Sequence, residues 1–222
     1  MKKFELTTEF ITNAFGKKLF RIKALVEFGD VKAGELGGYV EKEENVSQDG
    51  NAWVSGDARV YGNAWVHGNA KVYDDAWVSG DALVYGDALV YGDALVFGDA
   101  RVYGDARVSG DALVFGDARV SGNAWVSGNA WVSGNARVSG DALVFGDADY
   151  ALVQGFGTEF RCTTFYRGKD KKIMVNCGCF HGNLEAFRKQ AKETRSGKIA
   201  KEYLMIADLM EYHFASEDSS DE

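Results

Sequence analysis

The sequence contains no proline and only three cysteines among its 222 residues. Cys162, Cys177 and Cys179 form no C-x-x-C pair and no disulfide-like spacing, so a disulfide-stapled secreted domain is not predicted and a cytoplasmic location is expected. No run of 18 apolar residues occurs, which argues against a membrane-spanning helix. The basic start MKKFELTTEF lacks the apolar segment of a secretory signal, and none is predicted.

Positive charge is scarce in the middle of the chain. Residues 50–149 carry 6 basic and 13 acidic side chains, and therefore hold −7 of the net charge of −8. A generally acidic surface disfavours non-specific nucleic-acid binding. Two other classes stay open: an acidic DNA mimic, and a binding protein with a local basic site.

A six-residue phrase, V-x-G-[D/N]-A-x, repeats sixteen times from Val54 to Asp149. Asp74 replaces one glycine, and Tyr150 stands where a seventeenth valine would fall. A glycine every six residues opposes a helix by about 1 kcal/mol each. Instead, A-x-V-x predicts a four-residue strand with Ala and Val on one face and the variable residues on the other. Gly followed by Asp or Asn predicts a turn.

Such short strands bury their apolar side only by stacking. Coils of three hexads pair each strand with the strand 18 residues later and give a triangular parallel β-helix of roughly five to six coils. The phrase resembles the hexapeptide repeat of left-handed β-helix proteins, in which a small residue follows an aliphatic one four places later. That resemblance implies left-handed coils. The predicted fold class is an all-β solenoid with a small α+β appendage.

The segments on either side of the repeat, 50–149, are expected to cap the solenoid. Residues 1–49 predict a β cap with a hairpin around Phe15 and Gly16, and 150–215 predict two strands followed by two helices at about 183–194 and 198–214. A partner-binding C-terminal module is the alternative to capping. The acidic tail, 216–222, is expected to be disordered.

Residues 19–54 and 175–187 resemble a family of hexapeptide-repeat proteins from bacteriophages, prophages and their bacterial hosts. Its members carry labels such as transferase or polymer-forming protein. The resemblance spans almost the whole chain. It implies a phage origin, in which case the compartment is the cytoplasm of the host cell.

Sorting the variable residues by every eighteenth position predicts which side chains share a side of the solenoid. One side gathers apolar residues, and exposed patches of this kind mark interfaces. The residues predicted to form an oligomer interface are Trp77, Leu95, Phe97, Leu113, Phe115 and Trp131.

A second side stacks three arginines in successive coils, where like charges repel at a spacing of ~4.8 Å unless anions intervene. Either corner aspartates such as Asp99 and Asp117 pair with them, or the arginines and neighbouring rings bind a phosphate-bearing ligand. The predicted ligand-binding residues are Arg101, Arg119, Arg137, Tyr85, Tyr103, Trp65 and His67.

Catalytic and metal signals are weak. His67 is the single histidine in the repeats and would be the general base of a hexapeptide-repeat acyltransferase, but no orienting carboxylate is apparent. Cys177 and Cys179 are expected to share one face of a strand, with only His181 as a further metal ligand, so they are interpreted as free buried thiols. No phosphate loop or calcium-binding repeat is present, and no metal or cofactor is expected. Residues 50–149 contain no threonine, which excludes ice binding through threonine arrays.

The sequence favours a non-enzymatic, homo-oligomeric binding protein, with a trimer preferred to a dimer. Its expected role is host interaction or counter-defence, either by sequestering a phosphate-bearing nucleotide signal or by binding a host defence protein. An acyltransferase is the first alternative. An acidic DNA mimic or structural scaffold is the second.

Overall fold

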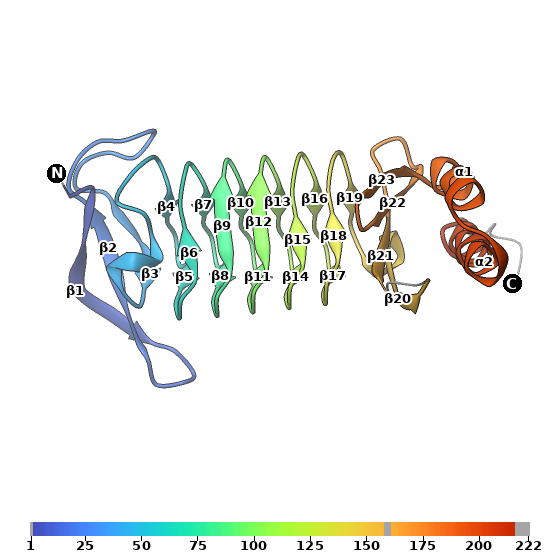
Figure 1. Ribbon diagram of the computed structural model, residues 1–222. Helices are drawn as coiled ribbons and strands as arrows, with labels where there is room; N and C mark the ends of the chain where they lie inside the picture. The colour runs from blue at the N-terminus through green and yellow to red at the C-terminus, as the bar shows by residue number, and fades with distance from the viewer. Residues whose placement is uncertain (1, 158–160, 216–222) are drawn as a thin grey trace, which may run out of the picture.

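The computed structural model describes residues 2–157 and 161–215. The molecule is elongated: a stack of similar coils lies between an N-terminal β cap and a C-terminal sheet with two helices (Figure 1). This confirms the predicted solenoid, with about six turns and parallel sheets along its sides. The direction in which the coils wind stays a prediction.

The solenoid strands form three parallel sheets, and each strand pairs with the strand 18 residues later, as Leu95 does with Leu113. Along the chain they are β4 (Trp53–Val54), β5 (Arg59–Val60), β6 (Trp65–Val66), β7 (Lys71–Val72), β8 (Trp77–Val78), β9 (Leu83–Gly86), β10 (Leu89–Val90), β11 (Leu95–Val96), β12 (Arg101–Gly104), β13 (Arg107–Val108), β14 (Leu113–Val114), β15 (Arg119–Val120), β16 (Trp125–Val126), β17 (Trp131–Val132), β18 (Arg137–Val138) and β19 (Leu143–Val144). The expected register is therefore present.

The interior of the coils is built from the fixed letters of the repeat. Every repeat alanine from Ala52 to Ala142 and every repeat valine from Val54 to Val144 is at most 1% exposed. Most strands are shorter than the four residues predicted, because alanine takes part in the corner. The Ala112 amide, for example, donates to the Ser109 carbonyl 3.4 Å away in the same coil.

Glycine is required at the corners for two reasons. Gly86 has φ = 74°, in the left-handed region, and a Cβ there would lie 2.9 Å from the amide nitrogen of Gly104 in the next coil. Asp74 holds φ = 58° at the one corner without glycine, a conformation that aspartate tolerates better than most residues.

The N-terminal segment closes the first coil. The predicted hairpin is present as β1 (Phe4–Thr12) and β2 (Lys18–Ala24), and β3 (Leu36–Val40) continues the same sheet onto β5. A short 3-10 helix, Glu43–Asn45, follows. Because no coil precedes the first one, some of its backbone carbonyl groups need hydrogen-bond donors from elsewhere in the chain.

Two buried side chains supply those donors. Lys3 Nζ donates to the carbonyls of Ala52 at 2.8 Å and Gly50 at 3.4 Å. Asn45 Nδ2 donates to the carbonyls of Ala64 at 2.8 Å and Gly62 at 3.2 Å. Inside the stack, backbone amides of the preceding coil donate to the equivalent carbonyls, as Trp53 does to Ala70. The Lys3 and Asn45 side chains therefore take the place of amide donors that a preceding coil would supply.

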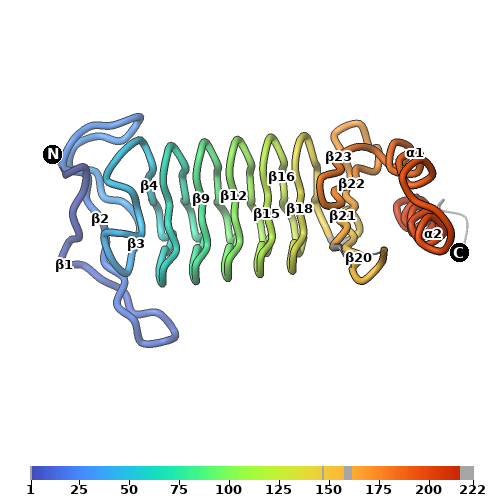
Figure 2. Tube along the Cα trace, viewed as in Figure 1, coloured from blue at the N-terminus to red at the C-terminus, as the bar shows by residue number. Residues whose placement is uncertain are grey.

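The C-terminal segment is an antiparallel sheet covered by two helices (Figure 2). Its elements are a 3-10 helix (Asp147–Asp149), β20 (Tyr150–Phe156), β21 (Arg161–Arg167), β22 (Ile173–Cys177), β23 (Phe180–Asn183), α1 (Leu184–Thr194) and α2 (Gly197–His213). The two helices confirm the prediction, but the sheet has four strands where two were expected. The repeat pattern runs up to Tyr150 and hides the start of β20, while the His-Gly-Asn end of β23 has weak strand propensity.

The two faces of the C-terminal sheet pack against different parts of the molecule. On β21, Phe165 packs toward the helices and Tyr166 packs against the solenoid core. Side chains of the sheet also cap the last coil: the Arg137 amide donates to Thr164 Oγ1 at 3.0 Å, and Asn176 Nδ2 donates to the Arg137 carbonyl at 2.7 Å. The Tyr166 hydroxyl donates to the carbonyl of Ser139 at 3.2 Å.

Two further expectations concern the chain as a whole. None of the described helices is long and apolar enough to cross a membrane. The tail expected to be disordered, 216–222, lies outside the described residues.

Replacing Asn45 tests the side-chain cap. Asn45 is fully buried, so Asn45→Ala leaves two carbonyls without donors and should lower the free energy of unfolding by about 1–3 kcal/mol in a urea titration. Asn51→Ala is the control, because that side chain is exposed at a corner and should change stability by less than about 0.5 kcal/mol. Equal losses in the two variants would contradict the capping role.

Lys3 predicts a dependence of stability on pH. Burial lowers its pKa from 10.5 to about 8, although Asp49 acts in the opposite direction. Between those values the unfolded chain binds more protons than the folded one, so the free energy of unfolding should rise with pH in this window. Urea titrations at about pH 7.5 and about pH 9.5 should show a larger rise for the wild type than for Lys3→Met. Lys2→Met, at an exposed position, should behave as the wild type does.

Candidate functional site

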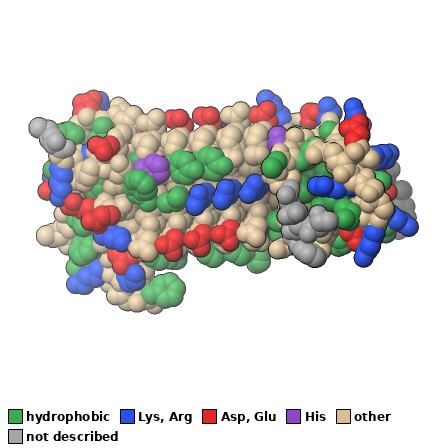
Figure 3. Space-filling model, in the orientation of Figure 1, with side chains coloured by type: hydrophobic (Ala, Val, Ile, Leu, Met, Phe, Trp, Pro, Cys, Tyr) green, Lys and Arg blue, Asp and Glu red, His purple; other side chains and the backbone are tan. Residues whose placement is uncertain are grey.

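The predicted ligand-binding residues lie on one side of the solenoid, formed by the variable residues of β6, β9, β12, β15 and β18, which we call the arginine face. Arg101 pairs in register with Arg119, and Arg119 with Arg137. Figure 3 shows a row of basic side chains along this side and a row of acidic ones next to it. Three guanidinium groups therefore stack at successive coils.

Of the two alternatives for the arginine column, pairing with corner aspartates is not present among the described residues. No carboxylate oxygen of a described residue lies within 4.0 Å of the guanidinium nitrogens of Arg101, Arg119 or Arg137. The one hydrogen bond formed by these three guanidinium groups among the described residues runs from Arg137 to the carbonyl of Gly178, at 3.4 Å. The column thus keeps donors for an outside acceptor.

Charge is not even along the column. The acidic row at the adjacent corners contains Asp81, Asp99 and Asp117, and its next member is the neutral Asn135. Arg137, in the coil of Asn135, therefore lies beyond the end of that row. That row of carboxylates therefore ends one coil before Arg137, which favours an anion near Arg119 and Arg137.

An aromatic ladder runs beside the arginines. The centroids of His67 and Tyr85, and those of Tyr85 and Tyr103, are 4.9 Å apart with nearly parallel planes. Trp65 stacks on His67 at 4.0 Å. The rings stack because residues 18 apart occupy the same position in neighbouring coils. The structure thus brings all seven predicted ligand-binding residues onto one face.

His67 is a poor match to a general base. Its ring stacks on Trp65 and on Tyr85, and burial lowers its pKa. Among the described residues no carboxylate orients the ring by a hydrogen bond or ion pair. A role in acyl transfer stays a hypothesis.

A hollow of ≈ 440 Å³ lies where the arginine face meets the C-terminal sheet. Sequence reasoning found two of its residues, Arg119 and Arg137. It named Asp117 as an alternative partner of the arginines and did not place the other five here, because nothing in the repeat shows where the C-terminal sheet docks. The additional lining residues are Asp117, Asn135, Cys162, Thr164, Asn176 and Gly178.

The residues predicted to form an oligomer interface also lie together, on the side formed by β5, β8, β11, β14 and β17, which we call the apolar face. Phe97 and Phe115 stack with centroids 5.0 Å apart, and Arg59 lies over the ring of Trp77 at 4.8 Å. Phe97 is 38% exposed and Trp131 is 56% exposed. This face has the composition of an interface core.

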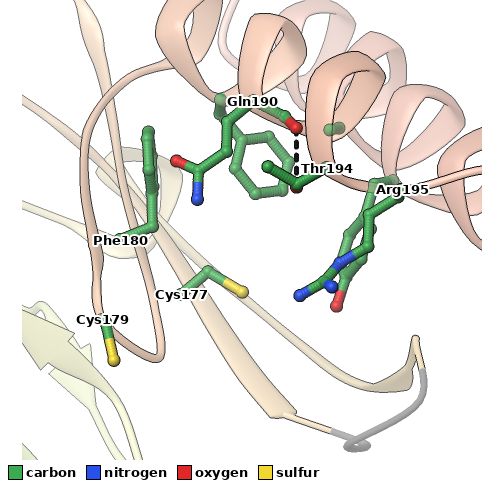
Figure 4. Close-up of a pocket in the computed structure, with 9 residues that line it drawn as sticks. Cys177, Cys179, Phe180, Gln190, Thr194 and Arg195 are labelled. Carbon is green, nitrogen blue, oxygen red and sulfur yellow. Dashed lines mark hydrogen bonds between the residues drawn. The ribbon is translucent and has the colours of Figure 1, made fainter.

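A smaller pocket of ≈ 90 Å³ lies within the C-terminal module, between the β22–β23 turn and the two helices. In Figure 4 the sulfur of Cys177 points toward Arg195, whereas that of Cys179 points away from it. The expectation that both cysteines share one strand face is wrong. Cys177 ends β22, and Gly178, with φ = 60°, turns the chain so that Cys179 lies in the turn. No group of three metal-ligating side chains occurs in the part of the chain that the structure describes.

Comparison with known families supports the solenoid and leaves the function open. The family model of the YdcK beta solenoid repeat matches residues 52–68, 100–116 and 118–134. Each match covers most of one coil, so the chain is similar to this family in its repeat. No curated protein matches the sequence.

Proposed function

We propose that this chain is a non-enzymatic binding protein whose arginine face takes an anionic, phosphate-bearing ligand. The observation that carries the proposal is the column of Arg101, Arg119 and Arg137, which has no carboxylate partner within 4.0 Å among the described residues. Stacked like charges raise the energy of the free protein, and a bound anion relieves that repulsion.

Phosphate suits the column better than a single carboxylate does. A guanidinium presents planar pairs of donors that match phosphate oxygens, and arginines one coil apart can each hold one phosphate group of a diphosphate. The neutral Asn135 beside Arg137 supports a subsite at the C-terminal end of the column. In this proposal the ligand is held and released chemically unchanged, and among the described residues no carboxylate orients His67 as a base beside the site.

The biological setting is part of the proposal. The resemblance of residues 19–54 and 175–187 to phage and prophage proteins supports a role in the cytoplasm of a bacterial host. Sequestration of a phosphate-bearing nucleotide signal would counter a defence system that depends on that signal. The hexapeptide phrase also supports left-handed coils.

The apolar face supports self-association. Leu95, Leu113 and Phe115 are half-buried and Phe97 is 38% exposed, so burying the face removes further apolar surface from water at about 25 cal/mol per Å². We therefore expect a homo-oligomer, with a trimer preferred to a dimer.

Leu95→Glu combined with Phe115→Glu should reduce the mass measured by light scattering to that of a monomer, because two carboxylates would be buried at the interface. The matched control, Leu89→Glu with Tyr91→Glu, changes the third side of the solenoid, formed by β4, β7, β10, β13, β16 and β19, and should keep the oligomer. An unchanged mass in the apolar-face variant, with an unchanged circular dichroism spectrum, would assign the oligomer to another surface.

Arg119 is the test residue for the anion site, because it lies at the centre of the column. Arg119→Ala should weaken binding of a nucleoside diphosphate about 10- to 100-fold in calorimetric titration, the loss expected for one charge-assisted hydrogen-bonded contact. Its control is Arg107→Ala, on the third side, where the guanidinium carbon lies 6.0 Å from the centroid of Trp125.

The outcomes of this titration separate the possibilities. Binding that is lost in Arg119→Ala and kept in Arg107→Ala supports the site. Equal binding by both variants, or no binding of any phosphate compound by the wild type, contradicts it. Consumption of an acyl donor that depends on His67 would favour the acyltransferase instead.

A further inference from the structure

The tripeptide Arg-Val-Ser occurs three times in the solenoid, at residues 107–109, 119–121 and 137–139. The first lies on the third side, formed by the variable residues of β4, β7, β10, β13, β16 and β19, and the other two lie on the arginine face. In each case the serine follows the arginine by two positions, so both side chains point outward from one coil. The same pair of polar groups is thus presented on two sides.

The aromatic rings in front of the first two tripeptides also match. On the third side, Tyr73 and Tyr91 stack at 4.9 Å, and the next position of their column is Ser109. On the arginine face, Tyr85 and Tyr103 stack at 4.9 Å, and the next position is Ser121. In both places a ladder of rings ends at a small hydroxyl side chain.

On the third side a ring of the protein itself covers the serine at the end of the ladder. Trp125, from the following coil, donates its indole N–H to Ser109 Oγ at 3.3 Å, and the guanidinium carbon of Arg107 lies 6.0 Å from its ring centroid. Ser109 is consequently only 5% exposed. An arginine and a serine in this arrangement therefore hold a planar heteroaromatic ring that has an N–H on its edge.

On the arginine face the equivalent ring is absent. Arg107 pairs in register with Trp125, whereas Arg119 pairs with Arg137. Ser121 is accordingly half-buried rather than buried, and the outer face of Tyr103 has no aromatic neighbour in its column. In Figure 3 the row of hydrophobic side chains along this side gives way to tan surface, which marks other side chains and the backbone, next to the basic row.

We propose that a nucleobase occupies this position, in the way that the indole of Trp125 occupies the position over Ser109. Its edge N–H donates to Ser121 Oγ and its face stacks on Tyr103, so that the attached phosphates lie between Arg119 and Arg137. On the third side the residue in register with Arg107 is the uncharged Trp125, whereas on the arginine face the residue in register with Arg119 is Arg137. Only the arginine face therefore offers a second cation for the phosphates. The ligand class is a nucleotide, not a bare phosphate or a sugar phosphate.

This inference rests on the anion site proposed above and adds the base subsite to it. The two parts separate by comparing nucleoside diphosphates with inorganic pyrophosphate, which offers the phosphates without the ring. The wild type should bind ADP or GDP at least about 10-fold more tightly than pyrophosphate, since stacking of one base contributes an affinity factor of this order.

Ser121→Tyr is designed to fill the subsite. A tyrosine there extends the ladder of Tyr85 and Tyr103 by one ring, at a position where the same column already holds tyrosine in two coils. It should weaken binding of the nucleoside diphosphate about 10-fold or more and leave pyrophosphate binding within about 2-fold of the wild type. Ser55→Tyr, which extends the ladder of Tyr73 and Tyr91 on the third side by one ring, is the matched control and should change neither.

A second pair of variants keeps the test decisive if Ser121→Tyr disturbs the coil. Tyr103→Leu removes the stacking platform and should also weaken the nucleoside diphosphate selectively. Tyr91→Leu removes the equivalent ring on the third side and should have no effect. Calorimetric titration measures all four variants, and circular dichroism monitors their fold.

The results distinguish the two proposals. If pyrophosphate and the nucleoside diphosphates bind the wild type equally, and neither variant on the arginine face discriminates between them, the base subsite is wrong and the anion site stands. If no phosphate compound binds the wild type, both proposals are wrong. Selective loss of the nucleoside diphosphates in Ser121→Tyr and Tyr103→Leu supports both.

Discussion

The pairing of each residue with the residue 18 positions later is the constraint on which the structure depends. It satisfies the backbone hydrogen bonds of the coils, and it also places the side chains of equivalent repeat positions directly above one another. Alanine and valine stack inside, where uncharged side chains can repeat without electrostatic repulsion. Outside, repetition has consequences: rings form ladders, whereas arginines and aspartates form rows of like charge. The surface chemistry of the protein is therefore a set of columns.

The columns of like charge are relieved in different ways. At the corners, asparagine donates to the aspartate of the next coil, as Asn63 does to Asp81 at 3.0 Å and Asn123 to Asp141 at 2.9 Å. Exchanging one aspartate for asparagine thus converts a repulsive contact into a hydrogen bond. The arginine column contains no such neutral member. That difference separates an ordinary solenoid corner from a surface suited to binding an anion.

Periodicity made the middle of this protein predictable and left its ends hidden. The phrase V-x-G-[D/N]-A-x was sufficient to place Arg101 under Arg119 and Tyr85 under Tyr103, because register follows directly from the period. Lys3, which supplies donors to the first coil, lies outside the repeat, so the repeat pattern could not predict its role. The Cys177–Cys179 turn was misjudged because Gly178 interrupts a segment that otherwise alternates as a strand does.

The 18-residue register also limits how such a gene can change length. Gain or loss of a single hexad leaves every fixed letter in place, so the core and the corners survive. It nevertheless moves every later variable residue onto the neighbouring side: the arginines of one half of the molecule would join the phenylalanines of the other. Only changes of three hexads lengthen or shorten the columns without mixing them. Selection on the surface should therefore favour insertions and deletions of whole coils of three hexads, although the core itself would tolerate single hexads.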